Sequence, residues 1–103
     1  MVDLRLKEDK LMAFGKIGWL WSASDLHREW PVGLQAKTIM PAIETGQFKI
    51  LEREGYPVAY CCWAFLDQKL EKDYLVNPVG LSPGDWQSGD RLWFVDWISR
   101  LIS

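Results

Sequence analysis

The segment Val58–Leu66 constrains the fold of this chain more than any other. It reads Val-Ala-Tyr-Cys-Cys-Trp-Ala-Phe-Leu, is rich in aromatic and β-branched side chains, and carries no charge. Such a run is typical of a central strand that is covered on both faces. A turn signal centred on Gly55 precedes it, and Gln47–Glu54 alternates like a second strand. The two segments therefore predict an antiparallel hairpin.

Helical periodicity accounts for much of the remaining chain. Apolar residues recur every three or four positions over Leu6–Ser22, which predicts a helix. We expect a second helix over Pro31–Met40, because proline suits a first turn and Pro41 lacks the N–H that a helix interior donates. A third helix is predicted over Asp67–Val76, with its first residue as the cap. A third strand is predicted over Arg91–Ile98.

Together these segments predict one α+β domain with a mixed or antiparallel sheet flanked by helices. A chain of 103 residues has room for one small domain at most, and no repeat or linker divides it. We therefore treat residues 1–103 as a single domain. In the third strand, strict alternation predicts one face with Leu92, Phe94, Asp96 and Ile98 and another with Trp93, Val95 and Trp97.

Composition argues against several classes of function. The formal net charge is −2, so no strong positive field favours nucleic acid. No apolar stretch reaches the roughly 18 residues that span a bilayer. Residues 1–10 mix charges and lack the apolar core of a signal peptide, so we expect no transmembrane segment and a cytoplasmic location. The seven tryptophans fit either a packed core or an apolar groove for a lipid chain.

Cys61 and Cys62 are adjacent, so their side chains point to opposite faces of a strand. One vicinal pair is no disulfide framework. With a single histidine elsewhere it is also a poor zinc site, which usually needs four ligands, or three and a water. We expect two small buried hydrophobes and no metal. The functional alternative is a transient acyl-thioester on one sulfur.

Two polar residues interrupt apolar surroundings. His27 is the only histidine and lies in the tryptophan-rich segment Gly18–Pro31. Imidazole titrates near neutral pH, which suits a general base, although a lone histidine more often has a structural role. Asp96 interrupts the third strand, and a buried carboxylate needs a partner. The candidates for that partner are Arg28, Arg91 and His27, and the residues alone do not choose between them.

Four segments carry a resemblance to a known family. They are Gly18–Pro31 with Ser24, His27 and Trp30, then Met40–Phe48, Gly55–Ala64 and Asp85–Ile98. Their order and spacing are similar to those of the toxin-activating lysine acyltransferases of RTX toxin operons. Four motifs in register, spread over most of the chain, are far more specific than a single short motif.

The resemblance implies a reaction and its residues. A fatty acyl group moves from acyl carrier protein to internal lysines of an RTX protoxin, without a bound cofactor. His27 and Asp96 fall on the family's two catalytic positions. The candidates for substrate contacts are Ser24, Arg28, Arg91 and Trp93. The arginines suit the carrier protein's acidic surface or phosphopantetheine phosphate, or alternatively surface ion pairs, and Ser24 alternatively caps a helix.

The resemblance also implies a sheet flanked by helices like that of the Gcn5-type acetyltransferases. No glycine-rich pyrophosphate loop is visible, which agrees with a carrier protein rather than free coenzyme A as the acyl donor. Family members continue past the strand that contains Asp96, so we expect a fold that is incomplete at its C-terminus. An apolar strand at the edge of such a sheet favours self-association, including a homodimer.

Two other functions compete with catalysis. One is a shortened, inactive remnant that binds carrier protein or protoxin, which an activity assay separates from an enzyme. The other is a tryptophan-rich interaction domain in which His27 is only packed. The distance between His27 and Asp96 separates that reading from catalysis.

Overall fold

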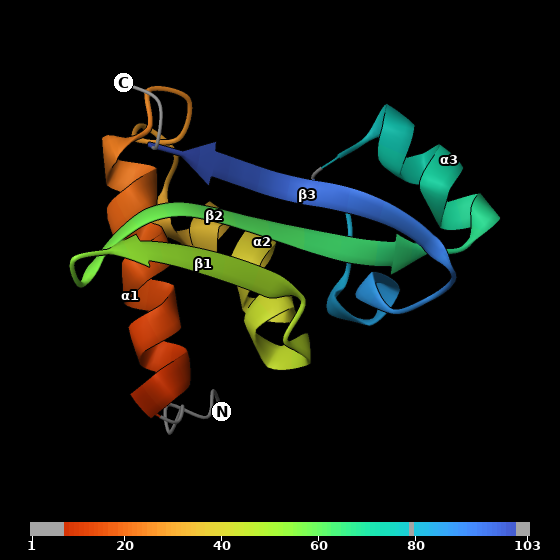
Figure 1. Ribbon diagram of the computed structural model, residues 1–103. Coiled ribbons are helices and arrows are strands. Elements are labelled where there is room, and N and C mark those ends of the chain that lie inside the picture. Colours follow the sequence, from red (N-terminus) through yellow and green to blue (C-terminus); the bar gives the residue numbers. More distant parts are fainter. Residues whose placement is uncertain (1–7, 79, 101–103) are drawn as a thin grey trace, which may run out of the picture.

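The structure is a computed structural model that describes residues 8–78 and 80–100. Figure 1 shows β2 between β1 and β3, and both neighbouring pairs are antiparallel. This arrangement confirms the predicted α+β class, with an antiparallel sheet. In chain order the elements are α1 (Glu8–Ala23), α2 (Val32–Thr45), β1 (Phe48–Arg53), β2 (Tyr56–Leu66), α3 (Gln68–Val76), the 3-10 helix η1 (Pro83–Trp86) and β3 (Arg91–Ser99).

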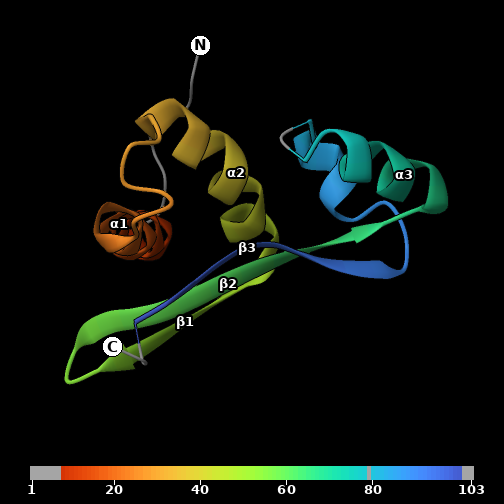
Figure 2. The ribbon, with the colours of Figure 1, turned by 90° about the horizontal axis from the view of Figure 1, so that it is seen from above.

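Helices α1 and α2 cover one face of the sheet (Figure 2). Their apolar sides pack on the inward-facing residues of β2 and on Ile98 of β3, which together form the core. Helix α3 lies at the end of the sheet where β2 finishes, and none of its residues is buried. None of the described helices is long and apolar enough to cross a membrane. The core residues of α1, α2 and β2 are Ala13, Ile17, Leu20, Trp21, Ile39, Ala42, Ile43, Tyr60, Cys62, Ala64 and Leu66.

The opposite face of the sheet has no helix over it within residues 8–78 and 80–100 (Figure 2). Cys61, Trp63 and Phe65 of β2 lie on this face and are partly exposed. The prediction that β2 is the central strand is confirmed, but the prediction that both of its faces are covered is wrong. Hydrophobic content alone does not distinguish a strand covered on both faces from one whose second face stays open to solvent.

A two-residue turn joins β1 to β2 and confirms the predicted hairpin. Arg53 pairs with Tyr56, and between them Glu54 and Gly55 have φ values of 53° and 82°. Two successive residues with positive φ are typical of a type I′ turn, whose twist matches that of the strands. Gly55 adopts this conformation without steric cost.

The sequence predicted that the second helix ends at Met40, and this prediction is wrong. Helix α2 continues through Pro41 to Thr45, because Pro41, Ala42 and Ile43 are apolar and buried, the last two in the core. Their packing outweighs the backbone hydrogen bond that Pro41 lacks. Gly46 then ends the helix with a φ of 75°, and its N–H donates to carbonyls of the last turn.

The other two helices agree with their predictions. Helix α1 spans Glu8–Ala23, and the predicted start at Leu6 lies outside the described residues. Helix α3 begins directly after Asp67, whose carboxylate accepts a hydrogen bond from Leu70 N at 2.8 Å. Asp67 is therefore the N-cap that the sequence predicted.

Strand β3 contains the irregularity that matters most for the site. Trp63 pairs with Phe94, but the preceding residue of β2, Cys62, pairs with Asp96. Val95 is therefore the extra residue of a β-bulge, which turns two successive side chains to the same face. As a result Trp93, Val95, Asp96 and Ile98 face the helices, while Leu92, Phe94 and Trp97 are exposed. The predicted strict alternation is wrong, because it reverses across the bulge.

Candidate active site

A short turn between α1 and α2 brings Ser24 and His27 together. His27 N and Arg28 N donate to Ser24 O at 3.1 and 2.9 Å, and Trp30 N donates to His27 O at 2.8 Å. Ser24 Oγ lies 2.7 Å from His27 Nδ1. The alternative that Ser24 caps a helix is therefore wrong, because Pro31 is the N-cap residue of α2.

Asp96 reaches the same imidazole from the sheet. The bulge turns its carboxylate toward the helices, and Oδ1 lies 2.7 Å from His27 Nε2. The side chains of His27 and Asp96 are 2% and 9% exposed. The partner of the carboxylate is thus the histidine and neither arginine, since Arg28 pairs with Asp25 and Arg91 pairs with Glu71.

Further donors surround the carboxylate of Asp96. Trp21 Nε1 donates to Oδ2 at 3.0 Å, the Tyr60 hydroxyl donates to the same oxygen, and Trp97 N donates to Oδ1 at 3.0 Å. An ionised carboxylate only accepts hydrogen bonds, so these donors hold it in one orientation. Sequence reasoning missed Tyr60. It pairs with Ile98 across the sheet, which places it diagonally opposite Asp96 on the same face, and only the register reveals this.

Two tryptophans pack against the imidazole of His27. The ring centroids of Trp21 and Trp30 lie 4.8 and 4.7 Å from that of His27, and the two indoles contact each other at 5.3 Å. Trp21 is buried in the core, whereas Trp19 is 62% exposed. The tryptophans therefore divide between a packed core, as at Trp21 and Trp86, and exposed surface, as at Trp19 and Trp97.

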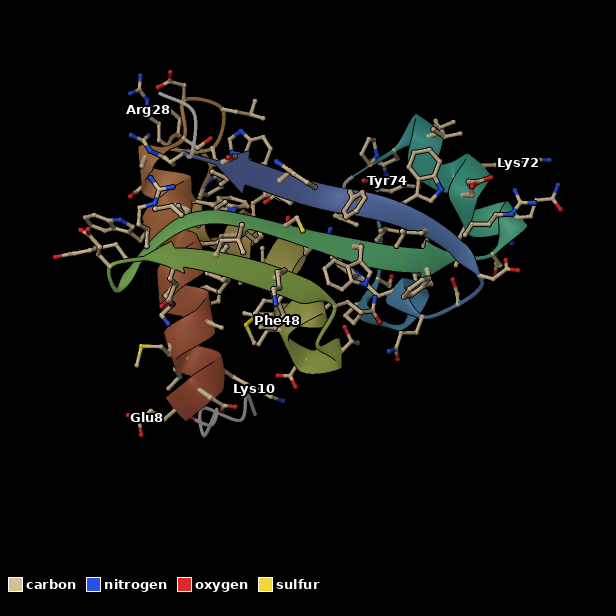
Figure 3. All side chains as sticks on the ribbon, viewed as in Figure 1. Glu8, Lys10, Arg28, Phe48, Lys72 and Tyr74 are labelled. Atoms are coloured by element: carbon tan, nitrogen blue, oxygen red, sulfur yellow. The ribbon has the colours of Figure 1, made fainter. Side chains whose placement is uncertain are left out.

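The side chains of the other candidate substrate contacts have partners outside this cluster. Arg28 extends into solvent beyond the end of α1 (Figure 3), 3.4 Å from Asp25. Arg91 and Trp93 both donate to Glu71 of α3, at 2.6 and 2.8 Å. The hydrogen bonds from Trp93 and Arg91 lower the pKa of Glu71 below its ordinary value. Both arginines thus form the surface ion pairs that the sequence left as an alternative.

The two cysteines point to opposite faces of β2, as predicted. Cys62 is buried under the helices and Cys61 is partly exposed on the open face. Burial raises the pKa of the Cys62 thiol to about 12 and also raises that of Cys61. Thiolate, the nucleophilic form, is therefore scarce on either sulfur at neutral pH. In the part of the chain that the structure describes, no group of three or more His, Cys, Asp or Glu side chains could hold a metal ion.

The cluster thus joins a hydroxyl, an imidazole and a carboxylate in one line of hydrogen bonds. The ring of His27 is hydrogen-bonded at both nitrogens, to Ser24 Oγ and to Asp96 Oδ1. An imidazole whose one nitrogen is held by a carboxylate can accept a proton at the other. The arrangement therefore suits general base catalysis.

Comparison with known proteins identifies the family. Residues 6–101 match the model of the RTX toxin acyltransferase family. The chain belongs to that family. The match contains Ser24, His27 and Asp96, and it confirms the resemblance drawn from the four sequence motifs.

Curated relatives agree with this assignment. The chain is 48% identical over 91 residues to the protein-lysine myristoyltransferase RtxC of Kingella kingae, which covers 88% of this chain and 54% of the relative. It is 48% identical over 85 residues to the RTX-I toxin-activating lysine-acyltransferase ApxIC of Actinobacillus pleuropneumoniae, covering 82% and 49%. It is 44% identical over 91 residues to the protein-lysine palmitoyltransferase CyaC of Bordetella bronchiseptica, covering 88% and 49%. The chain spans about half the length of these relatives.

Proposed function

We propose that this chain carries the catalytic residues of a protein-lysine acyltransferase. It moves a fatty acyl group from acyl carrier protein to lysine ε-amines of an RTX protoxin, in the cytoplasm. The observation that carries the proposal is the hydrogen-bonded line from Ser24 through His27 to Asp96. Family membership supports the reaction type. We further propose that residues 1–103 act as a single domain with a Gcn5-type arrangement of sheet and helices.

The chemistry of the reaction explains why such a line is needed. A lysine side chain has a pKa of about 10.4, so at neutral pH it is mostly protonated and is a poor nucleophile. After the amine attacks the thioester carbonyl, a base must take its proton, and an acid must return one to the departing thiolate. We assign both proton transfers to His27, and the hydrogen bond from Asp96 to its ring supports this assignment. The thioester brings the activated acyl group, so the step needs no resident cofactor.

The three remaining candidate contacts contribute unequally to this proposal. The Arg28 side chain is 57% exposed and is available to the acidic surface or the phosphate of a carrier protein. Arg91 and Trp93 are already engaged by Glu71, so a substrate would have to displace that carboxylate. We therefore assign carrier-protein contact to Arg28 first.

A second candidate function is binding without transfer. The observation that favours it is the burial of His27, whose side chain is 2% exposed. In this form the chain would recognise carrier protein or protoxin without transferring the acyl group.

One experiment separates the two functions. The purified chain is incubated with acyl carrier protein bearing a fatty acyl thioester and with a lysine-containing protoxin segment, and acyl-lysine is counted by mass spectrometry. We expect transfer, and we expect His27→Ala to reduce it by about 10²-fold or more. Gln68→Ala, an exposed polar change on α3, is the matched control. Binding by calorimetry without acyl-lysine would establish the second function, and the absence of both would contradict both.

A further inference from the structure

The two nitrogens of His27 have different partners, and this assigns the position of its proton. A carboxylate accepts and does not donate, so the bond from Asp96 Oδ1 to Nε2, at 2.7 Å, places the proton of the neutral ring on Nε2. Nδ1 is then the unprotonated nitrogen. It accepts from the Ser24 hydroxyl at 2.7 Å.

The basic nitrogen is therefore not open to a substrate. The imidazole is 2% exposed, and Trp21 and Trp30 pack against it and against each other. Its Nε2 edge meets Asp96, and its Nδ1 edge meets Ser24. Ser24 is partly exposed, unlike the buried ring. An amine that approaches His27 in this geometry reaches Ser24 Oγ before it reaches Nδ1.

The residue before Ser24, Ala23, is also hydrogen-bonded to the end of the sheet. Arg100 NH1 donates to Ala23 O at 2.6 Å, and Arg100 N donates to Val58 O at 2.7 Å. The first bond joins the residue after β3 to the last residue of α1, where the two segments lie close together in Figure 1, and the second joins it to β2. The end of the strand that carries Asp96 is thus hydrogen-bonded to the residue that precedes Ser24.

We propose that Ser24 Oγ, and not the imidazole itself, is the protein atom that meets the reacting amine, and that it relays the proton to His27 Nδ1. The inference rests on the proposed acyl transfer. A neutral lysine amine forms the C–N bond with the thioester carbonyl carbon. Its proton passes to Ser24 Oγ while the hydroxyl proton of Ser24 passes to Nδ1. The same path, reversed, protonates the thiolate as the C–S bond breaks, which leaves an amide, a free thiol and an unchanged site.

The position of the ring proton tests the geometry without any activity. His27 is the only histidine, so long-range ¹H–¹⁵N spectra of the chain contain a single imidazole and need no assignment. We expect the neutral ring to carry its proton on Nε2, with Nδ1 unprotonated. A wild-type ring protonated on Nδ1 would overturn the relay, because that nitrogen could not then accept the serine proton.

Transfer kinetics test the role of the hydroxyl. We expect Ser24→Ala to lower kcat by about 10-fold or more with little change in KM for the acyl donor, and Ser24→Thr, which keeps a hydroxyl, to recover most of that loss. Ser22→Ala is the matched control, because Ser22 is exposed and its hydroxyl donates to Trp19 O in its own helix. Unfolding measurements on each variant separate a chemical loss from a loss of folded protein.

The outcomes are decisive for different claims. A wild-type kcat in Ser24→Ala would overturn the relay and leave direct proton transfer to His27. An acyl ester on Ser24, seen in the intact mass after incubation with the acyl donor, would also overturn it, since the serine would then be the nucleophile. A wild-type chain with the expected ring proton but no transfer of any kind would overturn the proposed function instead, while the hydrogen-bond assignment would stand.

Discussion

At the scale of single residues, the carboxylate of Asp96 determines what His27 can do. Asparagine has nearly the same shape, but its amide can donate to Nε2 as well as accept from it, so the ring loses its preference for one tautomer. We expect Asp96→Asn to lower acyl transfer by about 10²-fold and to destabilise the fold by about 1–3 kcal/mol, because charge-assisted hydrogen bonds to Tyr60 and Trp21 are lost.

The control for this change is Asp73→Asn, an exposed carboxylate on α3. It should leave both transfer and urea unfolding unchanged. Equal transfer by Asp96→Asn and the wild type would show that His27 does not depend on its acidic partner.

Cys62 gives a prediction about pH. Its pKa rises from an ordinary 9.0 to about 12 because of burial, so between these values the unfolded chain loses the thiol proton while the folded chain keeps it. The stability that the neutral thiol contributes is therefore complete below about pH 9 and falls as the pH rises toward 12. In urea unfolding, the advantage of the wild type over Cys62→Ala should shrink from pH 8 to pH 10.5. Cys61→Ala, at a partly exposed thiol, should show a weaker trend, and a constant difference for Cys62 would contradict the prediction.

At the scale of elements, contiguous patterns were predictable and register was not. The hairpin, α1, α3 and the Asp67 cap follow from residues that are neighbours in sequence. The bulge at Val95 does not, because valine suits either face of a strand and only the pairing with β2 shows that it is extra.

The site divides in the same way. His27 and Asp96 stood out as polar groups among apolar residues, and the resemblance to the acyltransferase family then singled them out as a pair. Tyr60 and Trp21 did not stand out, because an aromatic side chain with a polar tip resembles ordinary core until the position of its partner is known. Pro41 was misjudged for a related reason, since the burial that sustains α2 beyond it depends on where the sheet lies.

The junction where β2 ends and the chain returns toward β3 depends on Gly89. A Cβ at this position would lie 2.5 Å from Asp67 Cα and from the Leu66 carbonyl carbon, which are backbone atoms that cannot turn aside. We expect Gly89→Ala to destabilise the fold by about 1–3 kcal/mol, measured by urea unfolding. Gly84→Ala is the matched control, because a Cβ there meets nothing within 4 Å. Similar stability of the two variants would mean that the junction is looser than this geometry indicates.

At the scale of the whole molecule, the two faces of the sheet differ. The helix-covered face holds the core and the Ser24–His27–Asp96 line, whereas the open face presents apolar side chains to solvent. Leu92, Phe94 and Trp97 of β3 are 52%, 52% and 60% exposed, and Leu51 of β1 is 45% exposed. A hollow of about 140 Å³ lies beside Leu51 and Trp97 and is also lined by Ala59, Cys61 and three further residues. Contiguous exposed apolar surface of this kind is uncommon on monomers and favours association.

We therefore expect the chain to associate with a second copy of itself through this face. Light scattering after gel filtration at micromolar concentration should give a mass above 12.0 kDa. The double change Leu92→Lys with Phe94→Lys should return it toward the monomer, because a lysine that becomes buried in an interface without a partner loses its hydration. Val76→Lys adds the same charge at an 87% exposed position on α3 and should leave the mass unchanged. A monodisperse monomer in the wild type would show that the open face is tolerated in water, and the half-exposed aromatic rings would then be a property of this fold rather than a contact surface.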